Sequence, residues 1–236
     1  GCGLRIRNPQ PSAAELSAMY TDSWTDPLHS TTETGGLTPH LATEYVKLII
    51  SELGINDLSD QNIMDFGAGR GALADALIAR GATAYGIEPF GQSYLQNRGI
   101  KAYAQLDDLP EDIRFDGIVS MDVVEHLQAP WTELAQLYQF LLPGGWILIA
   151  TPNPVGMAAK LNRGRWREAE KPGHILFLPP ATLELMMRKI GFQDVRRLRW
   201  RVRFSDRPLR RLIHLFLQMS GLDGHVRVLG RKPSAL

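Results

Sequence analysis

The spacing of apolar residues changes several times along the chain, and each change predicts a different element. Apolar residues recur at positions 41, 45, 48, 49 and 53, which indicates an amphipathic helix that ends at Gly54. Short apolar runs predict strands at 62–67, 83–88, 101–104, 115–121 and 146–150, with helical stretches between them. Strands that alternate with helices predict a parallel sheet with helices on both of its faces.

The two ends of the chain add further elements. Ser12 and Glu15 have the spacing of a capping box, which predicts the start of a short helix. The Thr-, Ser- and Gly-rich residues 21–38 are expected to form a loop or lid. Towards the C-terminus we expect a helix at 182–190, a strand at 192–202, a helix at 207–219 and a last strand at 225–230.

Three glycines at alternate positions follow the first strand. Gly67, Gly69 and Gly71 stand between that strand and a helix whose apolar positions begin at Leu73. Glycine allows a positive φ and lets a ligand approach the main chain, and the start of a helix presents unpaired N–H groups. The pattern therefore predicts a ligand-binding turn.

Two acidic residues bear on which ligand this turn binds. The glycines also fit a dinucleotide-binding fingerprint, with Glu88 near the position of a ribose-binding acid. Asp65, however, puts a carboxylate where a dinucleotide would bring its anionic pyrophosphate. A ligand with an ammonium and a sulfonium group would be attracted there. We therefore favour S-adenosylmethionine, and keep a nicotinamide-dependent oxidoreductase as an alternative.

Composition limits the class of protein. The 236 residues, with 44% hydrophobic and 22% charged residues, suit one α/β domain with short additions. Apolar runs are too short for a membrane span, and the single cysteine, Cys2, fits a reducing compartment. We expect a cytoplasmic protein.

Positive charge is concentrated near the C-terminus. The net charge is +1, but residues 196–232 contain eleven Arg or Lys residues and two Asp residues. The helix at 207–219 combines apolar residues with arginines, a pattern that suits packing on the sheet, a homodimer or peripheral contact with an anionic membrane. We expect no nucleic-acid partner, because no basic stretch with interleaved aromatic residues accompanies the glycine turn.

Five segments in order carry a family resemblance, at residues 65–71, 86–88, 115–127, 142–145 and 150–153. Together they resemble the class I S-adenosylmethionine-dependent methyltransferases, particularly the small-molecule group with ubiquinone-type O-methyltransferases and bacterial sugar methyltransferases. The resemblance implies an α/β, Rossmann-like fold: a seven-stranded, mostly parallel sheet with an antiparallel last strand and helices on both faces. Residues 59–236 would form the cofactor-binding domain, and residues 1–58 an N-terminal helical or lid extension.

Metal binding is not expected. The segment that begins with Cys2 is similar to one that follows a Cys-x-x-Cys zinc knuckle in some of these enzymes. One cysteine cannot make a tetrahedral zinc site, so such a knuckle is missing from this chain. The histidines show no spacing typical of zinc ligands, and magnesium is not indicated either.

The resemblance assigns roles at the cofactor site. Glu88 would accept hydrogen bonds from both ribose hydroxyls, and the three glycines would pass under the methionine portion. Gln105 and Leu106 would lie at the adenine end, where the family has an aspartate in place of Gln105; Ser120 and Met121 would pass near the cofactor.

The acceptor side is less defined by sequence. His126 and His174 are candidate general bases, and for each the alternative is a role in holding its loop. The acceptor pocket is expected between the 21–38 segment and an insert at 155–171. From these segments Trp24, Arg163, Arg165 and Trp166 would stack on a ring or bind a phosphate or carboxylate, and the alternative for the arginines is a solvated helix face.

These observations predict an S-adenosylmethionine-dependent methyltransferase acting on a small-molecule acceptor. O-methylation of a sugar, phenol or quinone-like compound is favoured. The alternative of another class is a cofactor-binding or regulatory protein of the same fold without turnover.

Overall fold

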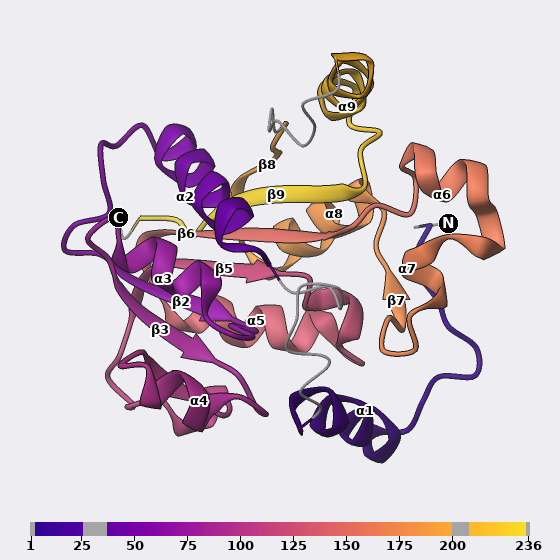
Figure 1. Ribbon diagram of the computed structural model, residues 1–236. Helices are drawn as coiled ribbons and strands as arrows, with labels where there is room; N and C mark the ends of the chain where they lie inside the picture. The colour runs from indigo at the N-terminus through magenta and orange to yellow at the C-terminus, as the bar shows by residue number, and fades with distance from the viewer. Residues whose placement is uncertain (1–2, 26–36, 200–207, 235–236) are drawn as a thin grey trace.

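A seven-stranded sheet organises the molecule (Figure 1). The computed structural model describes residues 3–25, 37–199 and 208–234. The strand order is β4-β3-β2-β5-β6-β9-β8, and β9 is antiparallel to both neighbours whereas the contacts among β2 to β6 are parallel. The fold predicted from the sequence is confirmed. The strands are β2 (Asn62–Phe66), β3 (Thr83–Ile87), β4 (Lys101–Tyr103), β5 (Phe115–Met121), β6 (Leu141–Pro152), β8 (Gln193–Arg197) and β9 (His225–Arg231).

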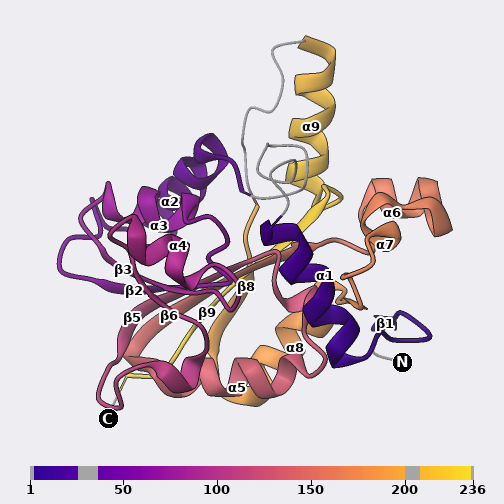
Figure 2. The same ribbon diagram turned by 60° about the horizontal axis from the view of Figure 1, so that its bottom comes forward.

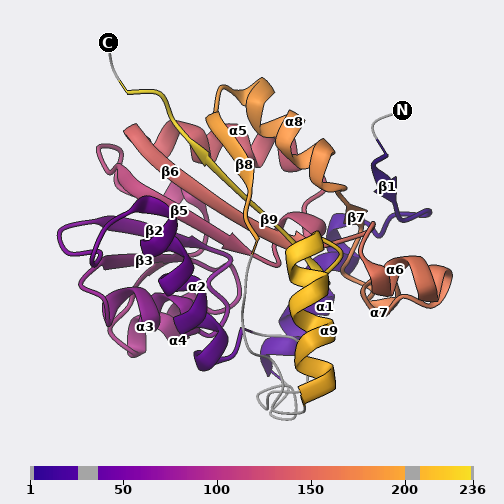
Figure 3. The ribbon, with the colours of Figure 1, turned by 90° about the horizontal axis from the view of Figure 1, so that it is seen from above.

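Helices cover both faces of the sheet (Figures 2 and 3). One face carries α2 (Pro39–Leu53), α3 (Ala72–Ile78) and α4 (Gln92–Asn97), and the other carries α5 (Pro130–Phe140) and α8 (Pro180–Ile190). Each face has its own hydrophobic core, because the strands of a doubly covered sheet bury side chains in both directions. Tyr45 and Ile49 of α2 lie in the same core as Leu77 of α3, so α2 is part of this helical layer.

The N-terminal segment returns to the middle of the chain. β1 (Arg5–Ile6) pairs antiparallel with β7 (Leu176–Phe177), forming a two-stranded ribbon apart from the main sheet. α1 (Ala13–Thr25) begins at the predicted capping box, in which the backbone N–H of Ser12 donates to Glu15 and that of Glu15 to the Ser12 hydroxyl. The predicted helix start is confirmed.

Several boundaries differ from the sequence-based expectation. β6 begins at Leu141 and not at the expected 146, because Leu141 already pairs with Phe115, so α5 ends at Phe140. α8 begins at Pro180, two residues before the expected start, since proline suits a position where the backbone N–H has no helical partner. The insert forms α6 (Met157–Asn162), η4 (Arg163–Arg165) and α7 (Arg167–Glu170), and two further 3-10 turns are η2 (Leu106–Asp108) and η3 (Val124–His126).

α9 (Pro208–Ser220) projects from the body of the molecule (Figure 2). Gln218 is buried and Leu215 and Leu217 are partly buried. Five other large apolar residues of the helix are 43–71% exposed; they are Leu209, Leu212, Ile213, Phe216 and Met219. No helix within the described ranges is long and apolar enough to span a membrane.

Candidate functional site

The glycine turn lies at the C-terminal end of β2, in the middle of the sheet. Gly67, Gly69 and Gly71 all have positive φ, of 81°, 50° and 82°. A side chain at Gly67 would come within 2.2 Å of Val123, whereas one at Gly69 would meet no protein atom within 4 Å. The turn is therefore packed on one side and open on the other.

Asp65 and Glu88 lie beside this turn, and both carboxyl groups are buried. Burial raises the pKa of Asp65 to about 7, the nearby Glu88 charge adds to the rise, and a backbone hydrogen bond from Ala74 opposes it. Oδ2 of Asp65 has no hydrogen-bond partner among the described residues. A buried carboxylate with an unpartnered oxygen is a site suited to a cationic group.

Glu88 accepts hydrogen bonds from both the glycine turn and the loop that follows β3. Its Oε2 accepts a hydrogen bond from the Gly69 N–H at 2.9 Å, and its Oε1 accepts one from the Phe90 N–H at 3.3 Å. Burial raises the pKa of Glu88, and these two hydrogen bonds oppose the rise. Each carboxylate oxygen has a second lone pair, so both can still accept from a ligand hydroxyl.

The other residues expected at the cofactor have varied surroundings. Ser120 is fully buried at the end of β5, where its Oγ has no partner within the described ranges, and the neighbouring Met121 is partly buried. Leu106 is buried, while Gln105 is exposed and precedes η2. Its backbone and side-chain N–H groups donate to Asp108, the last residue of η2. Their contacts with a cofactor stay predictions.

A second group of side chains surrounds His126 at the end of η3. Nδ1 of His126 lies 2.8 Å from the carbonyl oxygen of Gly173 and 2.5 Å from the hydroxyl of Tyr20. A carbonyl oxygen can only accept, so this contact favours the tautomer with hydrogen on Nδ1 and leaves the lone pair on Nε2. Burial lowers the pKa of His126, which keeps the ring neutral near pH 7.

Tyr20 links this group to the glycine turn. Its ring stacks on Phe90 with ring centres 5.6 Å apart, and the Phe90 N–H is bound by Glu88. Burial raises the pKa of Tyr20, and the charges of Glu125 and Glu88 raise it further, so the hydroxyl stays protonated. α1 thus contributes a side chain that contacts both His126 and the loop bound by Glu88.

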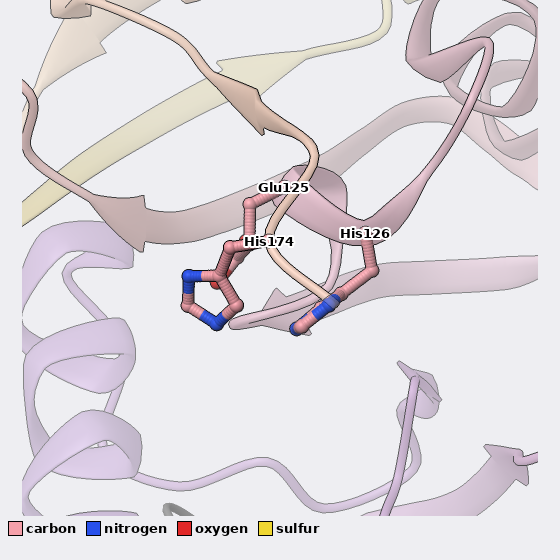
Figure 4. Close-up of side chains that lie close together, drawn as sticks. All are labelled: Glu125, His126 and His174. Carbon is pink, nitrogen blue, oxygen red and sulfur yellow. The ribbon is translucent and has the colours of Figure 1, made fainter. Parts of the chain in front are cut away.

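His174 and Glu125 complete the group, and Figure 4 shows them beside His126. The rings of His126 and His174 are perpendicular, with centres 4.6 Å apart. Burial, followed by the neighbouring His126, lowers the pKa of His174 to about 3, so His174 is a neutral ring at physiological pH.

Glu125 is fully buried next to these rings. Its Oε2 accepts a hydrogen bond from the Thr151 hydroxyl at 2.9 Å, while its Oε1 has no partner among the described residues. Burial raises the pKa of Glu125 well above its ordinary value, and the charge of Asp122 adds to this rise. Glu125 is therefore a buried acid held protonated beside two neutral histidines.

The expectation that the protein holds no metal remains a prediction. One donor atom from each of Glu125, His126 and His174 lies within 4.8 Å of the others, a grouping from which a divalent ion could take ligands. Such an ion would require Glu125 to lose its proton.

The residues expected to bind the acceptor do not form one group. Trp166 is 6% exposed and packs on Phe177 and Ala159, so it is part of a small core and not an open stacking surface. Arg163 and Arg165 are exposed on η4. Trp24 belongs to α1, but its side chain lies outside the described residues, as do most residues of the proposed 21–38 lid.

Two residues of the His126 group were absent from the sequence-based set. Glu125 directly precedes His126, and an acid beside a candidate base is a signal that could have marked it. Gly173 is 47 positions away from His126, and its part in the group is a backbone carbonyl, which no sequence pattern indicates.

Comparison with known proteins identifies the family. A model described as a methyltransferase domain matches residues 39–197, more than half of the chain. The chain belongs to this methyltransferase family. The resemblance inferred from the five sequence segments is confirmed.

This chain has curated relatives that are named for different substrates. It is 32% identical to the tRNA U34 carboxymethyltransferase of Azotobacter vinelandii, over 59% of this chain and 48% of that protein. It is 25% identical to the ubiquinone biosynthesis O-methyltransferase of Leptothrix cholodnii, over 63% of this chain and 66% of that protein. The chain thus spans between about half and two thirds of the length of these relatives.

A solved structure has the same fold. It is the 1,6-didemethyltoxoflavin-N1-methyltransferase of Burkholderia thailandensis, with bound 1,6-didemethyltoxoflavin and S-adenosylhomocysteine, at a TM-score of 0.58 and 18% identity. The match covers 97% of this chain and 94% of that chain. At this identity it supports the fold alone.

Proposed function

We propose that this methyltransferase uses S-adenosylmethionine to methylate a small-molecule acceptor, with an oxygen on a phenol, sugar or quinone-like ring as the favoured site. The observation that supports this most is that two different groups follow or end the neighbouring central strands β2 and β5. One is the buried, unpartnered carboxylate oxygen of Asp65; the other is the neutral His126 with its lone pair on Nε2. Tyr20 contacts both His126 and Phe90, and the Phe90 N–H donates to Glu88 beside the glycine turn.

The residues at the glycine turn suit the proposed cofactor. Asp65 would bind the ammonium of its methionine portion, and the open side at Gly69 leaves room for the chain of the ligand. Glu88 would accept from ribose hydroxyls with its remaining lone pairs. When bound, S-adenosylmethionine supplies an electrophilic methyl group on sulfur.

His126 would act on the acceptor. Its Nε2 would take the proton from an acceptor hydroxyl, so that the oxygen can accept the methyl group that the cofactor would supply. The Gly173 carbonyl stabilises the imidazolium that forms, because it accepts the hydrogen on Nδ1. Glu125, being protonated and buried, adds no charge beside the ring.

Calorimetry with S-adenosylhomocysteine tests the cofactor site, with NADH as the competing ligand. Micromolar binding to the wild-type protein is expected, with a loss of at least about tenfold in Asp65→Asn and Glu88→Gln, since each removes a charged partner. Asp112→Asn is the matched control, because Asp112 is exposed. Binding of NADH in place of S-adenosylhomocysteine would favour the oxidoreductase alternative.

A radiolabelled methyl donor then tests turnover and the acceptor class. Phenols, quinols and sugars form one set of acceptors and bulk tRNA forms another, because one relative is named as a tRNA-modifying enzyme. Label in the small-molecule set that disappears in His126→Gln supports the proposal. Label in tRNA alone contradicts the proposed substrate class, and cofactor binding without label in either set favours a protein that binds without turnover.

A further inference from the structure

A pocket of about 260 Å3 lies outside the His126 group, between the β1–β7 ribbon and the insert of α6, η4 and α7. Arg5, Arg7 and Arg163 line it together with Trp166 and Phe177. These residues come from three separate parts of the chain. The antiparallel pairing of Arg5 with Phe177 brings the N-terminal arginines to the insert.

The charged side chains that line this pocket are all arginines. Neither Arg5 nor Arg163 forms an ion pair with a carboxylate among the described residues. The guanidinium of Arg7 is bound by backbone oxygens, at 3.1 Å to His174, 2.7 Å to Ala169 and 2.8 Å to Lys171. Three arginines that face one hollow without an acid repel one another, and an anion there would relieve this repulsion.

The remaining wall is apolar and aromatic. Trp166 and Phe177 are both less than 10% exposed, and their ring centres lie 5.2 Å apart. Ile6, which also lines the pocket, is 54% exposed. Pockets for drug-sized ligands measure about 300–1,000 Å3, so this one suits a smaller molecule or one end of a larger molecule.

We propose that this pocket binds the anionic group of a small molecule, a phosphate or carboxylate carried on an apolar or aromatic body. Arg5 from β1 and Arg163 from η4 bind the anion, and Arg7 adds a fixed positive charge. The apolar body lies against the exposed side chain of Ile6 and the small parts of Trp166 and Phe177 that line the pocket. The site is separate from the glycine turn, so it does not depend on the identity of the cofactor.

Phenyl phosphate and inorganic phosphate are the probes that test this pocket by calorimetry. Phenyl phosphate is expected to bind the wild-type protein more tightly than inorganic phosphate, because its ring buries apolar surface of the pocket wall, chiefly that of Ile6. Arg5→Gln and Arg163→Gln should each weaken phenyl phosphate binding by about tenfold or more, and the double variant should abolish it.

Arg165→Gln is the matched control. Arg165 is exposed on the same 3-10 turn as Arg163 but does not line the pocket, so its removal should leave binding unchanged. An equal loss in Arg165→Gln, or no binding of phenyl phosphate to the wild-type protein at millimolar concentration, would overturn the proposal. S-adenosylhomocysteine affinity and the melting temperature, measured in parallel, separate this result from a failure of the cofactor site or of folding.

Kinetics distinguish two sources of the anion. If phenyl phosphate competes with an acceptor found by the radiolabel assay, the anionic group belongs to the acceptor. If it binds without competing, the pocket holds a separate ligand. Both results support the binding site, and the arginine variants decide whether it exists.

Discussion

The hydroxyl of Tyr20 lies 2.5 Å from Nδ1 of His126, although 106 positions separate the two residues in the chain. Gly173 contributes its carbonyl oxygen to the same nitrogen, so Nδ1 has two oxygen neighbours and Nε2 is left with the lone pair. The orientation of the proposed base is therefore set by a helix and a loop that both lie far from it in sequence.

Removal of the base should affect turnover much more than removal of the tyrosine hydroxyl. His126→Gln should lower kcat by about 10²- to 10⁴-fold, the usual contribution of general acid–base catalysis. Tyr20→Phe should lower kcat far less, because the Gly173 carbonyl still holds Nδ1. Steady-state kinetics with the acceptor found by the radiolabel assay measure both, and an equal loss in the two variants would contradict this division of roles.

Gly173→Ala should displace the Tyr20–His126 pair. A Cβ at position 173 would lie 2.6 Å from the Tyr20 hydroxyl and 3.3 Å from Nδ1 of His126, so one of them must move. We expect kcat to fall and S-adenosylhomocysteine affinity to change little.

Two further variants test whether the loss in Gly173→Ala comes from the contact with Tyr20. Gly164→Ala is the control, since a Cβ there meets no atom within 4 Å. Adding Tyr20→Phe to Gly173→Ala removes the atom in closest contact and should restore part of the activity; no recovery would assign the loss to another cause.

Cofactor affinity should depend on pH through Asp65. Its pKa of about 7 means that the carboxylate takes up a proton as the pH falls below 7, and a protonated Asp65 no longer attracts an ammonium group. Affinity for S-adenosylhomocysteine should therefore weaken by up to about tenfold per pH unit below 7. Calorimetry from pH 5.5 to 8.5 measures this slope, and Asp65→Asn should flatten it.

The stability of the free protein should respond to the same group. Because the pKa of Asp65 is raised in the folded state, the folded protein binds its proton more tightly than the unfolded chain does. This contribution to the free energy of unfolding is fully present below about pH 4 and is lost as the pH rises through 7. Denaturant unfolding of the wild type and Asp65→Asn should differ in pH dependence across that window.

The outer face of α9 should tolerate polar substitution if no partner covers it. Leu212 and Phe216 are both 64% exposed, so Leu212→Ser and Phe216→Ser should change the free energy of unfolding by no more than about 0.5 kcal/mol. Leu137→Ala in the fully buried part of α5 should cost about 2–5 kcal/mol. Thermal and denaturant unfolding measure these differences.

The same α9 variants address the predicted homodimer or membrane contact. Light scattering coupled to gel filtration reports the oligomeric state, and sedimentation with vesicles of anionic or neutral lipid reports membrane binding. A dimer or vesicle complex that is lost in Phe216→Ser would show which partner covers the helix. A protein that stays monomeric and binds neither type of vesicle would contradict both the predicted homodimer and the predicted membrane contact.

Local patterns in the sequence determined much of this protein. The capping box of Ser12 and Glu15, the three glycines and the alternation of strands with helices all act within a few residues, so their physical meaning is readable before folding. Asp65 could be interpreted for a similar reason, because its distance from the first glycine fixes its place at the end of a strand.

Tertiary structure alone decided the rest. No periodic pattern relates the segments that bring Tyr20 and Gly173 to His126, or those that bring Arg5 and Arg7 to the pocket with Arg163. The burial that raises the pKa of Glu125 is also a result of tertiary packing. The tertiary structure also showed Trp166 to be a core residue of the insert. Such contacts depend on the path that each loop takes back to the sheet. The packing of the whole chain sets this path, and the local preferences of the loop residues do not.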